Sequence, residues 1–185
     1  MDKQFSLKER LLLSNQYNIL AKLSSDEDEK KQYENLSEVF RAGYVWGYGL
    51  ATETILGETT KEECRFVLDT LDMYSRLYFS RRESKEAQEA IEEKEVLFKG
   101  FDLNDPQEGK YYSFYKFLVE DLNRFSEYKE LIEKGKIEGY NSHGFGPSME
   151  TIEMMLRKAK EVDVIRHDRH DLYYTKEEIE EILKR

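Results

Sequence analysis

Apolar residues recur at helical spacing through most of the chain, and most strongly over residues 61–79, KEECRFVLDTLDMYSRLYF. Two apolar stripes run along this segment, whereas a helix on a protein surface needs only one. The pattern therefore predicts an all-α fold, a multi-helix bundle around a buried central helix over about residues 61–79. The first stripe is Cys64, Val67, Leu68, Leu71, Tyr74, Ser75 and Tyr78, and the second is Phe66, Met73 and Leu77.

Further helices are predicted from stripes and from capping boxes, in which a Ser or Thr precedes a Glu by three residues. The first helix should run from Leu7 to about Leu23, with a broad apolar face made of Leu12, Leu13, Tyr17, Leu20 and Leu23. Residues 83–95 are nearly all Glu, Lys, Gln and Ala, which predicts a solvated, projecting connector helix. The other predicted helices cover about 27–44, 106–125, 148–162 and 176–183. A packed loop is predicted at 96–101. Residues 127–134 either continue the helix 106–125 or form a separate short helix.

Glycines interrupt an aromatic stretch at residues 43–50, where Tyr44, Trp46 and Tyr48 alternate with smaller residues. Because glycine destabilises a helix interior, continuity of the second helix is doubtful here. Tyr and Trp pair a large ring with a polar tip and suit interfaces. We therefore predict Tyr44, Trp46 and Tyr48 at a homo-oligomer interface, the alternative being a core rimmed by tyrosines. The chain has no internal repeat or linker, so residues 1–185 are predicted to form a single domain.

Composition narrows the class of protein. Among 185 residues, 39% are hydrophobic, 37% are charged and the net charge is −10. A strongly acidic chain argues against general nucleic-acid binding, and one cysteine cannot form an internal disulfide. The absence of a signal pattern or a long apolar run argues against a membrane partner and predicts a cytoplasmic location.

The segment 140–147, YNSHGFGP, is the first candidate for chemistry. Free amides at the helix start that follows would attract an anion. Asn141, Ser142, His143 and Phe145 are therefore candidate ligands of a small acidic molecule, with His143 as donor or base. The segment lacks a phosphate-loop motif. The alternative is an ordinary glycine-rich connector.

A second candidate is the segment 166–171, RHDRHD, in which His167 and His170 are three residues apart. Two imidazoles and nearby acids suit a metal, but without distant ligands they make a weak site, and we predict no metal and no cofactor. The neighbouring basic cluster offers a nucleic-acid surface only if its members share one face. These members are Arg157, Lys158, Lys160, Arg166 and Arg169. The alternative is a solvated turn of mixed charge.

Cys64 lies on the first stripe of the central helix. A cysteine nucleophile needs an adjacent base, and the stripe surrounds Cys64 with apolar residues instead. We therefore interpret Cys64 as a buried structural thiol.

Four segments together resemble the YfbU family: RLLLSNQYNIL near the start, CRFVLDTLDMYSRL, FKGFD and HGF. The resemblance covers nearly the whole chain from about Lys8. It implies a bacterial, cytoplasmic, mostly helical protein and supplies no reaction or catalytic residue. The family is sometimes joined to a helix-turn-helix segment, which implies ligand binding or regulation.

We therefore expect a non-catalytic domain that binds a ligand or partner and acts as a homo-oligomer. An enzyme using His143 in the loop 139–147 is the first alternative, and it requires a pocket that contains His143. A nucleic-acid-binding protein using the cluster 157–170 is the second.

Overall fold

The computed structural model describes residues 5–53, 55, 57–166 and 172–184. The predicted all-α fold is confirmed: the described residues form helices and one isolated parallel β-bridge, between Phe101 and Asn141. The chain divides into two compact units, Met1–Glu58 and Thr59–Arg185. The prediction that both belong to a single domain stays a prediction. No described helix is long and apolar enough to cross a membrane.

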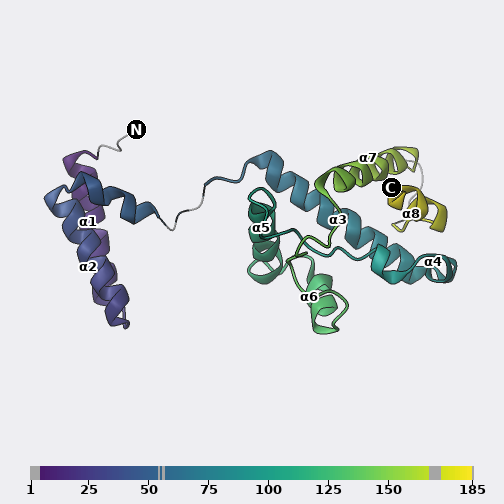
Figure 1. Ribbon diagram of the computed structural model, residues 1–185, viewed down its shortest axis with the longest axis horizontal. Helices are drawn as coiled ribbons and strands as arrows, with labels where there is room; N and C mark the ends of the chain where they lie inside the picture. Colours follow the sequence, from purple (N-terminus) through teal and green to yellow (C-terminus); the bar gives the residue numbers. More distant parts are fainter. Residues whose placement is uncertain (1–4, 54, 56, 167–171, 185) are drawn as a thin grey trace. The chain divides into compact units, whose positions relative to one another are not determined.

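The first unit is a helical hairpin followed by a short 3-10 helix (Figure 1). It contains α1 (Leu7–Leu23), α2 (Glu27–Ala42) and η1 (Val45–Thr52). Small residues mark the contact between α1 and α2, where Ser14 and Ala21 are buried and the Ser37 hydroxyl donates to the Ser14 carbonyl at 2.9 Å. Because α2 covers only one side of α1, Leu12 and Leu23 of the predicted apolar face are exposed.

Gly43 ends α2 two residues earlier than predicted. Its φ of +80° is left-handed, a conformation that glycine adopts without steric cost. Arg10 of α1 donates to the last carbonyls of α2, to Phe40 O at 2.9 Å and to Arg41 O at 3.0 Å. The aromatic stretch that follows forms η1 and does not continue the helix, as its glycines indicated.

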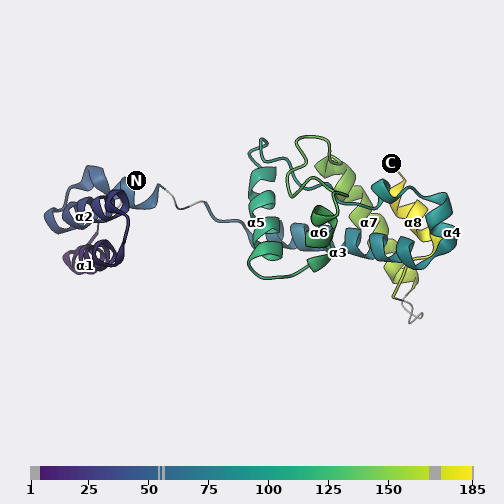
Figure 2. The ribbon, with the colours of Figure 1, turned by 90° about the horizontal axis from the view of Figure 1, so that it is seen from below.

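The second unit is built around α3 (Lys61–Glu83), the predicted central helix, which is confirmed. Figures 1 and 2 show α3 running along the unit, and it contacts α4, α5, α7 and α8. Both predicted stripes contribute buried residues, namely Val67, Leu71, Tyr74, Met73 and Leu77, and α3 also buries Thr70 and Ser80, which neither stripe included. The helices around it are α4 (Lys85–Ala90), α5 (Glu108–Glu120), α6 (Ser126–Glu133), α7 (Met149–Ile165) and α8 (Lys176–Leu183).

Residues 83–95 do not form the predicted projecting helix. The segment breaks into α4 and the 3-10 turn η2 (Glu93–Glu95), and α4 packs against α3 and α8. Ala87 is fully buried and Ile91 nearly so. Two apolar residues, Ala87 and Ile91, therefore pack this segment against the unit, although its composition is typical of a solvated helix.

Residues 96–101 form the predicted packed loop, with Val96, Phe98 and Phe101 fully buried. The helix α5 begins at Glu108, two residues after Pro106, because the Asp105 carboxylate caps the turn by accepting from the Gln107 and Glu108 amides. The helix α5 ends at Glu120, earlier than the predicted 125, and residues 126–133 form the separate helix α6. Between them Asn123 and Phe125 take left-handed φ values of 51° and 54°, which a continuous helix cannot contain.

Candidate functional site

The candidate loop 139–147 is fixed to the packed segment 96–101. The Phe101 amide donates to Tyr140 O at 3.2 Å, and the Ser142 amide donates to Phe101 O at 3.0 Å. Gly100 makes the approach possible, because a Cβ at this position would lie 2.1 Å from Tyr140 O, and its φ is +97°. Two segments 40 residues apart in sequence are therefore hydrogen-bonded to each other in one corner of the unit.

Within the loop, the four predicted ligand residues have different surroundings. The Asn141 carboxamide oxygen accepts from the Leu103 amide at 3.2 Å and from the His143 amide at 3.0 Å, so it holds the turn. Ser142 is buried, whereas Phe145 is 79% exposed. His143 has a left-handed φ of 49° and an exposed side chain.

Two adjoining cavities, of about 630 and 360 Å³, open beside this loop. Both volumes lie near the range of small-ligand sites. Lys94, Leu97, Lys99 and Phe145 line both of them. The smaller cavity adds Lys136, Ile137, Glu138, Asn141 and Ser142, and the larger adds the start of α7 at Pro147, Ser148 and Thr151. The cavities thus bring together Asn141, Ser142 and Phe145, and they leave out His143.

We call these two cavities the lysine cleft, after Lys94, Lys99 and Lys136. Lys94 pairs with Glu92 at 2.5 Å, and the hydrogen bond to Glu92 raises the pKa of Lys94. Lys136 pairs with Glu93 at 2.5 Å, and the Lys99 ammonium donates to Phe145 O at 3.4 Å. Each ammonium keeps further donors for an anion. The cleft lies beside the start of the 17-residue helix α7, and Glu95 and Glu138 line it together with the three lysines.

The sequence singles out the loop but not the lysines that lie beside it. Lys94 lies in a charge-rich stretch that resembles a solvated connector, and Lys136 follows a short amphipathic helix. The available signal was Lys99 next to Gly100, because a glycine between buried aromatic residues indicates close backbone approach. Nothing local indicates which distant loop approaches.

The predicted interface residues divide between the surface and the interior of the first unit. Trp46 is 87% exposed and Tyr44 is also exposed. Tyr48 is buried, and its ring stacks on Phe40 at 5.2 Å between centroids. Tyr48 therefore belongs to the interior of its own unit, which leaves Tyr44 and Trp46 for a partner.

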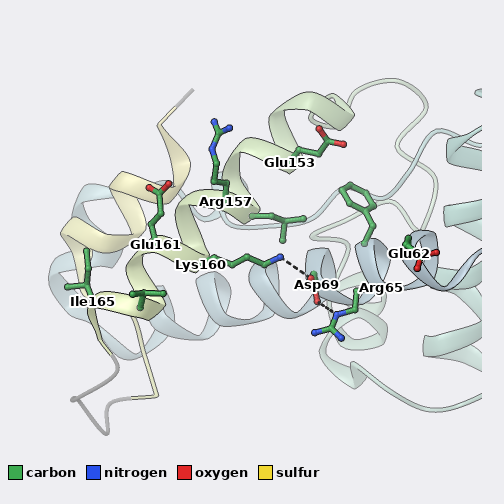
Figure 3. Close-up of a pocket in the computed structure, with 11 residues that line it drawn as sticks. Glu62, Arg65, Asp69, Glu153, Arg157, Lys160, Glu161 and Ile165 are labelled. Atoms are coloured by element: carbon green, nitrogen blue, oxygen red, sulfur yellow. Dashed lines mark ion pairs between the residues drawn. The ribbon is translucent and has the colours of Figure 1, made fainter.

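A third concavity, of about 920 Å³, is an open groove between α3 and α7 (Figure 3). Its lining includes the apolar Phe66, Leu156, Val164 and Ile165. Asp69 forms ion pairs with Arg65, at 3.6 Å, and with Lys160, at 3.4 Å. Glu153, Arg157 and Glu161 lie along α7, and Glu62 lies across the groove on α3 (Figure 3). Charges of both signs are therefore mixed along this groove.

The basic cluster does not form one surface. Arg157 and Lys160 line the groove of mixed charge between α3 and α7, whereas the Lys158 ammonium donates to Lys184 O at 2.6 Å. Arg166 is buried and pairs with Glu178. Arg169 lies outside the described residues, as do His167 and His170. The arrangement gives no support to the nucleic-acid alternative.

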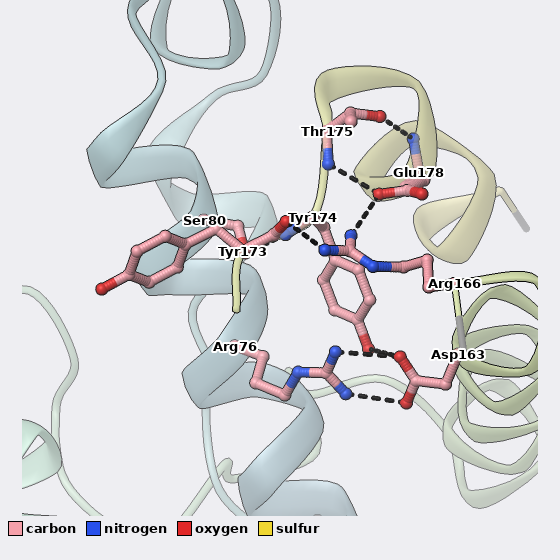
Figure 4. A network of polar contacts seen from close by, with 8 residues as sticks. All are labelled: Arg76, Ser80, Asp163, Arg166, Tyr173, Tyr174, Thr175 and Glu178. Carbon is pink, nitrogen blue, oxygen red and sulfur yellow. Dashed lines mark hydrogen bonds and ion pairs between the residues drawn. The ribbon is translucent and has the colours of Figure 1, made fainter. Parts of the chain in front are cut away.

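Arg166 takes part in a polar network that ties α3, α7 and the start of α8 together (Figure 4). Arg76 of α3 makes two hydrogen bonds to Asp163 of α7, at 2.7 and 2.9 Å. The Tyr174 ring lies against both guanidinium groups, and burial raises the pKa of its hydroxyl. The Tyr174 amide donates to the Ser80 hydroxyl at 2.8 Å. These groups hold helices in place.

Cys64 is half-buried, and its thiol lies 3.9 Å from Thr59 O, where it donates a weak hydrogen bond. The described residues include no cluster of three or more His, Cys, Asp or Glu that could hold a metal ion.

Comparison with known proteins gives two findings. A family model described as the YfbU domain matches residues 4–185. The UPF0304 protein MJECS11 of Methanocaldococcus jannaschii is 33% identical over 136 residues, which cover 73% of this chain and 76% of that protein.

Proposed function

Since the chain belongs to the YfbU family, whose function is uncharacterised, we propose on physical grounds that it is a cytoplasmic, non-catalytic domain that binds a small acidic ligand and acts as a homo-oligomer. The observation that carries the ligand proposal is the convergence of Lys94, Lys99 and Lys136 on the loop 139–147. A net charge of −10 makes such a local group of cations unusual on this protein.

The chemistry of the lysine cleft favours an anion with a short apolar part. Three ammonium groups and the positive end of the α7 dipole attract negative charge. Glu95 and Glu138 also line the cavities, and Lys94 and Lys136 are paired with glutamates, so Lys99 is the cation on which the proposal chiefly rests. Leu97, Ile137 and Phe145 supply an apolar wall. The size of the cleft suits a molecule such as a small dicarboxylate or a phosphorylated metabolite.

Catalysis by His143 has less support. Its side chain is exposed and lines none of the three cavities described above. A base must lie within hydrogen-bond reach of a bound substrate. We therefore do not propose an enzyme.

Calorimetric titration tests the ligand proposal, with succinate and inorganic phosphate as the two probes. We expect saturable binding of at least one probe, weakened about tenfold in Lys99→Ala and in Lys136→Ala, which corresponds to about 1.4 kcal/mol for each lost charge contact. The matched control is Lys134→Ala, whose side chain is exposed and pairs with Glu130 of its own helix. Heat changes that do not saturate for either probe, or equal affinity in all three variants, would refute the proposal.

A further inference from the structure

The side of α1 opposite α2 is uncovered within its own unit, and it carries aliphatic side chains together with the exposed Lys8 and Lys22. The side toward α2 carries the buried Ser14 and Ala21. Away from α2, α1 exposes five large aliphatic side chains, with exposed fractions between 57 and 79%. They are Leu7, Leu11, Leu12, Ile19 and Leu23.

Four of these side chains, with Asn15, form a single row along the helix. Leu7, Leu11, Asn15, Ile19 and Leu23 follow one another at intervals of four residues. Rows of this spacing are the ridges that interdigitate in the commonest class of helix packing, with axes crossing at about −50°. The row is thus shaped for another helix that carries a ridge of the same kind.

The row also reads the same in both directions: aliphatic, aliphatic, Asn, aliphatic, aliphatic. A two-fold contact requires a self-complementary surface. If two copies of α1 cross antiparallel at Asn15, Leu11 lies near Ile19 of the second copy. The row turns by about 40° round the helix at each step, so Leu7 and Leu23 lie outside the centre of this contact. Asn15 then faces Asn15 of the second copy, and two carboxamides can pair with each other. A polar pair of this kind within an apolar contact fixes the register.

We infer that α1 is the surface through which two copies of this chain associate, crossing at Asn15. The inference deepens the homo-oligomer proposed above by giving it an interface, and it does not depend on the lysine cleft.

The size of the surface fits a weak or transient association. Burial of one aliphatic side chain removes about 60–120 Å² from water. The five in each copy therefore amount to at most roughly 600–1,200 Å², which is the range of weak interfaces and meets the lower limit of stable ones only at its upper end. The first unit also needs such cover, because two helices and a turn bury little of their own apolar surface. Two helical hairpins that pair become a four-helix arrangement, a common stable solution.

Light scattering and analytical ultracentrifugation of the full chain test the inference. We expect a dimer at tens of micromolar, a rough scale for stable association. The double variant Leu11→Gln with Ile19→Gln should weaken the dimer at least 100-fold. Gln is a good helix former, so far-ultraviolet circular dichroism should be unchanged. The control is Leu122→Gln, which alters an exposed leucine of the second unit and should leave the dimer intact.

A cysteine placed at the crossing gives a second readout that does not depend on destabilising a surface. In a Cys64→Ser background, Asn15→Cys should form an intermolecular disulfide under mild oxidation, because two-fold symmetry brings residue 15 next to its own copy. Gln16→Cys, one residue round the helix, should form much less.

The outcomes separate the two proposals. A wild-type monomer refutes both the α1 interface and the homo-oligomer, and leaves ligand binding untouched. A dimer that survives Leu11→Gln with Ile19→Gln but dissociates in Trp46→Ala refutes the α1 interface alone and indicates η1 instead.

Discussion

At the scale of single residues, Gly100 decides whether the corner beside the lysine cleft can form. Gly100→Ala would place a Cβ 2.1 Å from Tyr140 O in a backbone conformation with φ of +97°. We expect it to lower the free energy of unfolding by about 3 kcal/mol or more, from the combined cost of the clash and the strained backbone. Urea denaturation measures the loss.

The control for this substitution is Gly49→Ala. A Cβ at Gly49 meets no atom within 4 Å. A loss below about 1 kcal/mol at Gly49 would be an ordinary surface effect. An equal loss in the two variants would show that the approach of Gly100 to Tyr140 does not govern stability.

Residue-level chemistry also marks the limit of what the sequence predicts. Glycine at position 100 indicates a close approach, but the partner, Tyr140 O, is 40 positions away. Tyr48 and Trp46 read alike in the sequence, yet one stacks on Phe40 and the other is exposed. Such differences depend on tertiary contacts with residues distant in sequence, which a local sequence pattern does not predict.

At the scale of elements, prediction succeeds where the determinants are local. The capping boxes that begin α1, α3 and α8 are all present, because each uses only residues within one turn. The bounds of α3 follow from its box and its two stripes. The conformation of residues 83–95 does not follow from local sequence, since Ala87 and Ile91 become buried only through contacts with other parts of the unit, such as α3 and α8.

The box that begins α3 gives a prediction about pH. The Thr60 amide donates to the Glu63 carboxylate at 2.7 Å, and this hydrogen bond lowers the pKa of Glu63 from its ordinary 4.5. A carboxyl whose pKa is lower in the folded state stabilises the protein above its unfolded pKa, and this stabilisation is lost as pH falls through the folded pKa. Glu63→Gln removes the titration and keeps an acceptor for the amide.

We therefore expect wild type to exceed Glu63→Gln in free energy of unfolding at pH 7, and the difference to shrink as pH falls below 4.5. Urea denaturation from pH 7 to pH 3 measures it. Glu62→Gln, which removes a charge from the same turn and leaves the Thr60–Glu63 pair intact, is the control for the helix dipole. The same pH dependence in both variants would assign the effect to the dipole.

At the scale of the whole molecule, the large apolar core lies entirely in the second unit. Every member of the core cluster falls between Phe66 and Leu183. We expect residues 59–185 expressed alone to fold cooperatively, because they contain that core complete. Circular dichroism and the dispersion of amide resonances would show it.

The complementary fragment, residues 1–58, is the matched comparison. It buries few apolar side chains and should gain helix as its concentration rises, because its exposed α1 needs cover. A fragment 59–185 that is unfolded at every concentration would favour the single cooperative domain that the sequence predicts.

The β-bridge between Phe101 and Asn141 has a practical consequence for any study of the lysine cleft. Its two amide protons, on Phe101 and Ser142, each join the lysine-bearing segment to the candidate loop. Both hydrogen bonds must break when the corner opens, so the deuterium exchange rates of the two amides report the same opening motion. A molecule that binds in the cleft should lower the exchange rates of both amides by the same factor. These two rates can therefore report occupancy of the cleft before the molecule is identified.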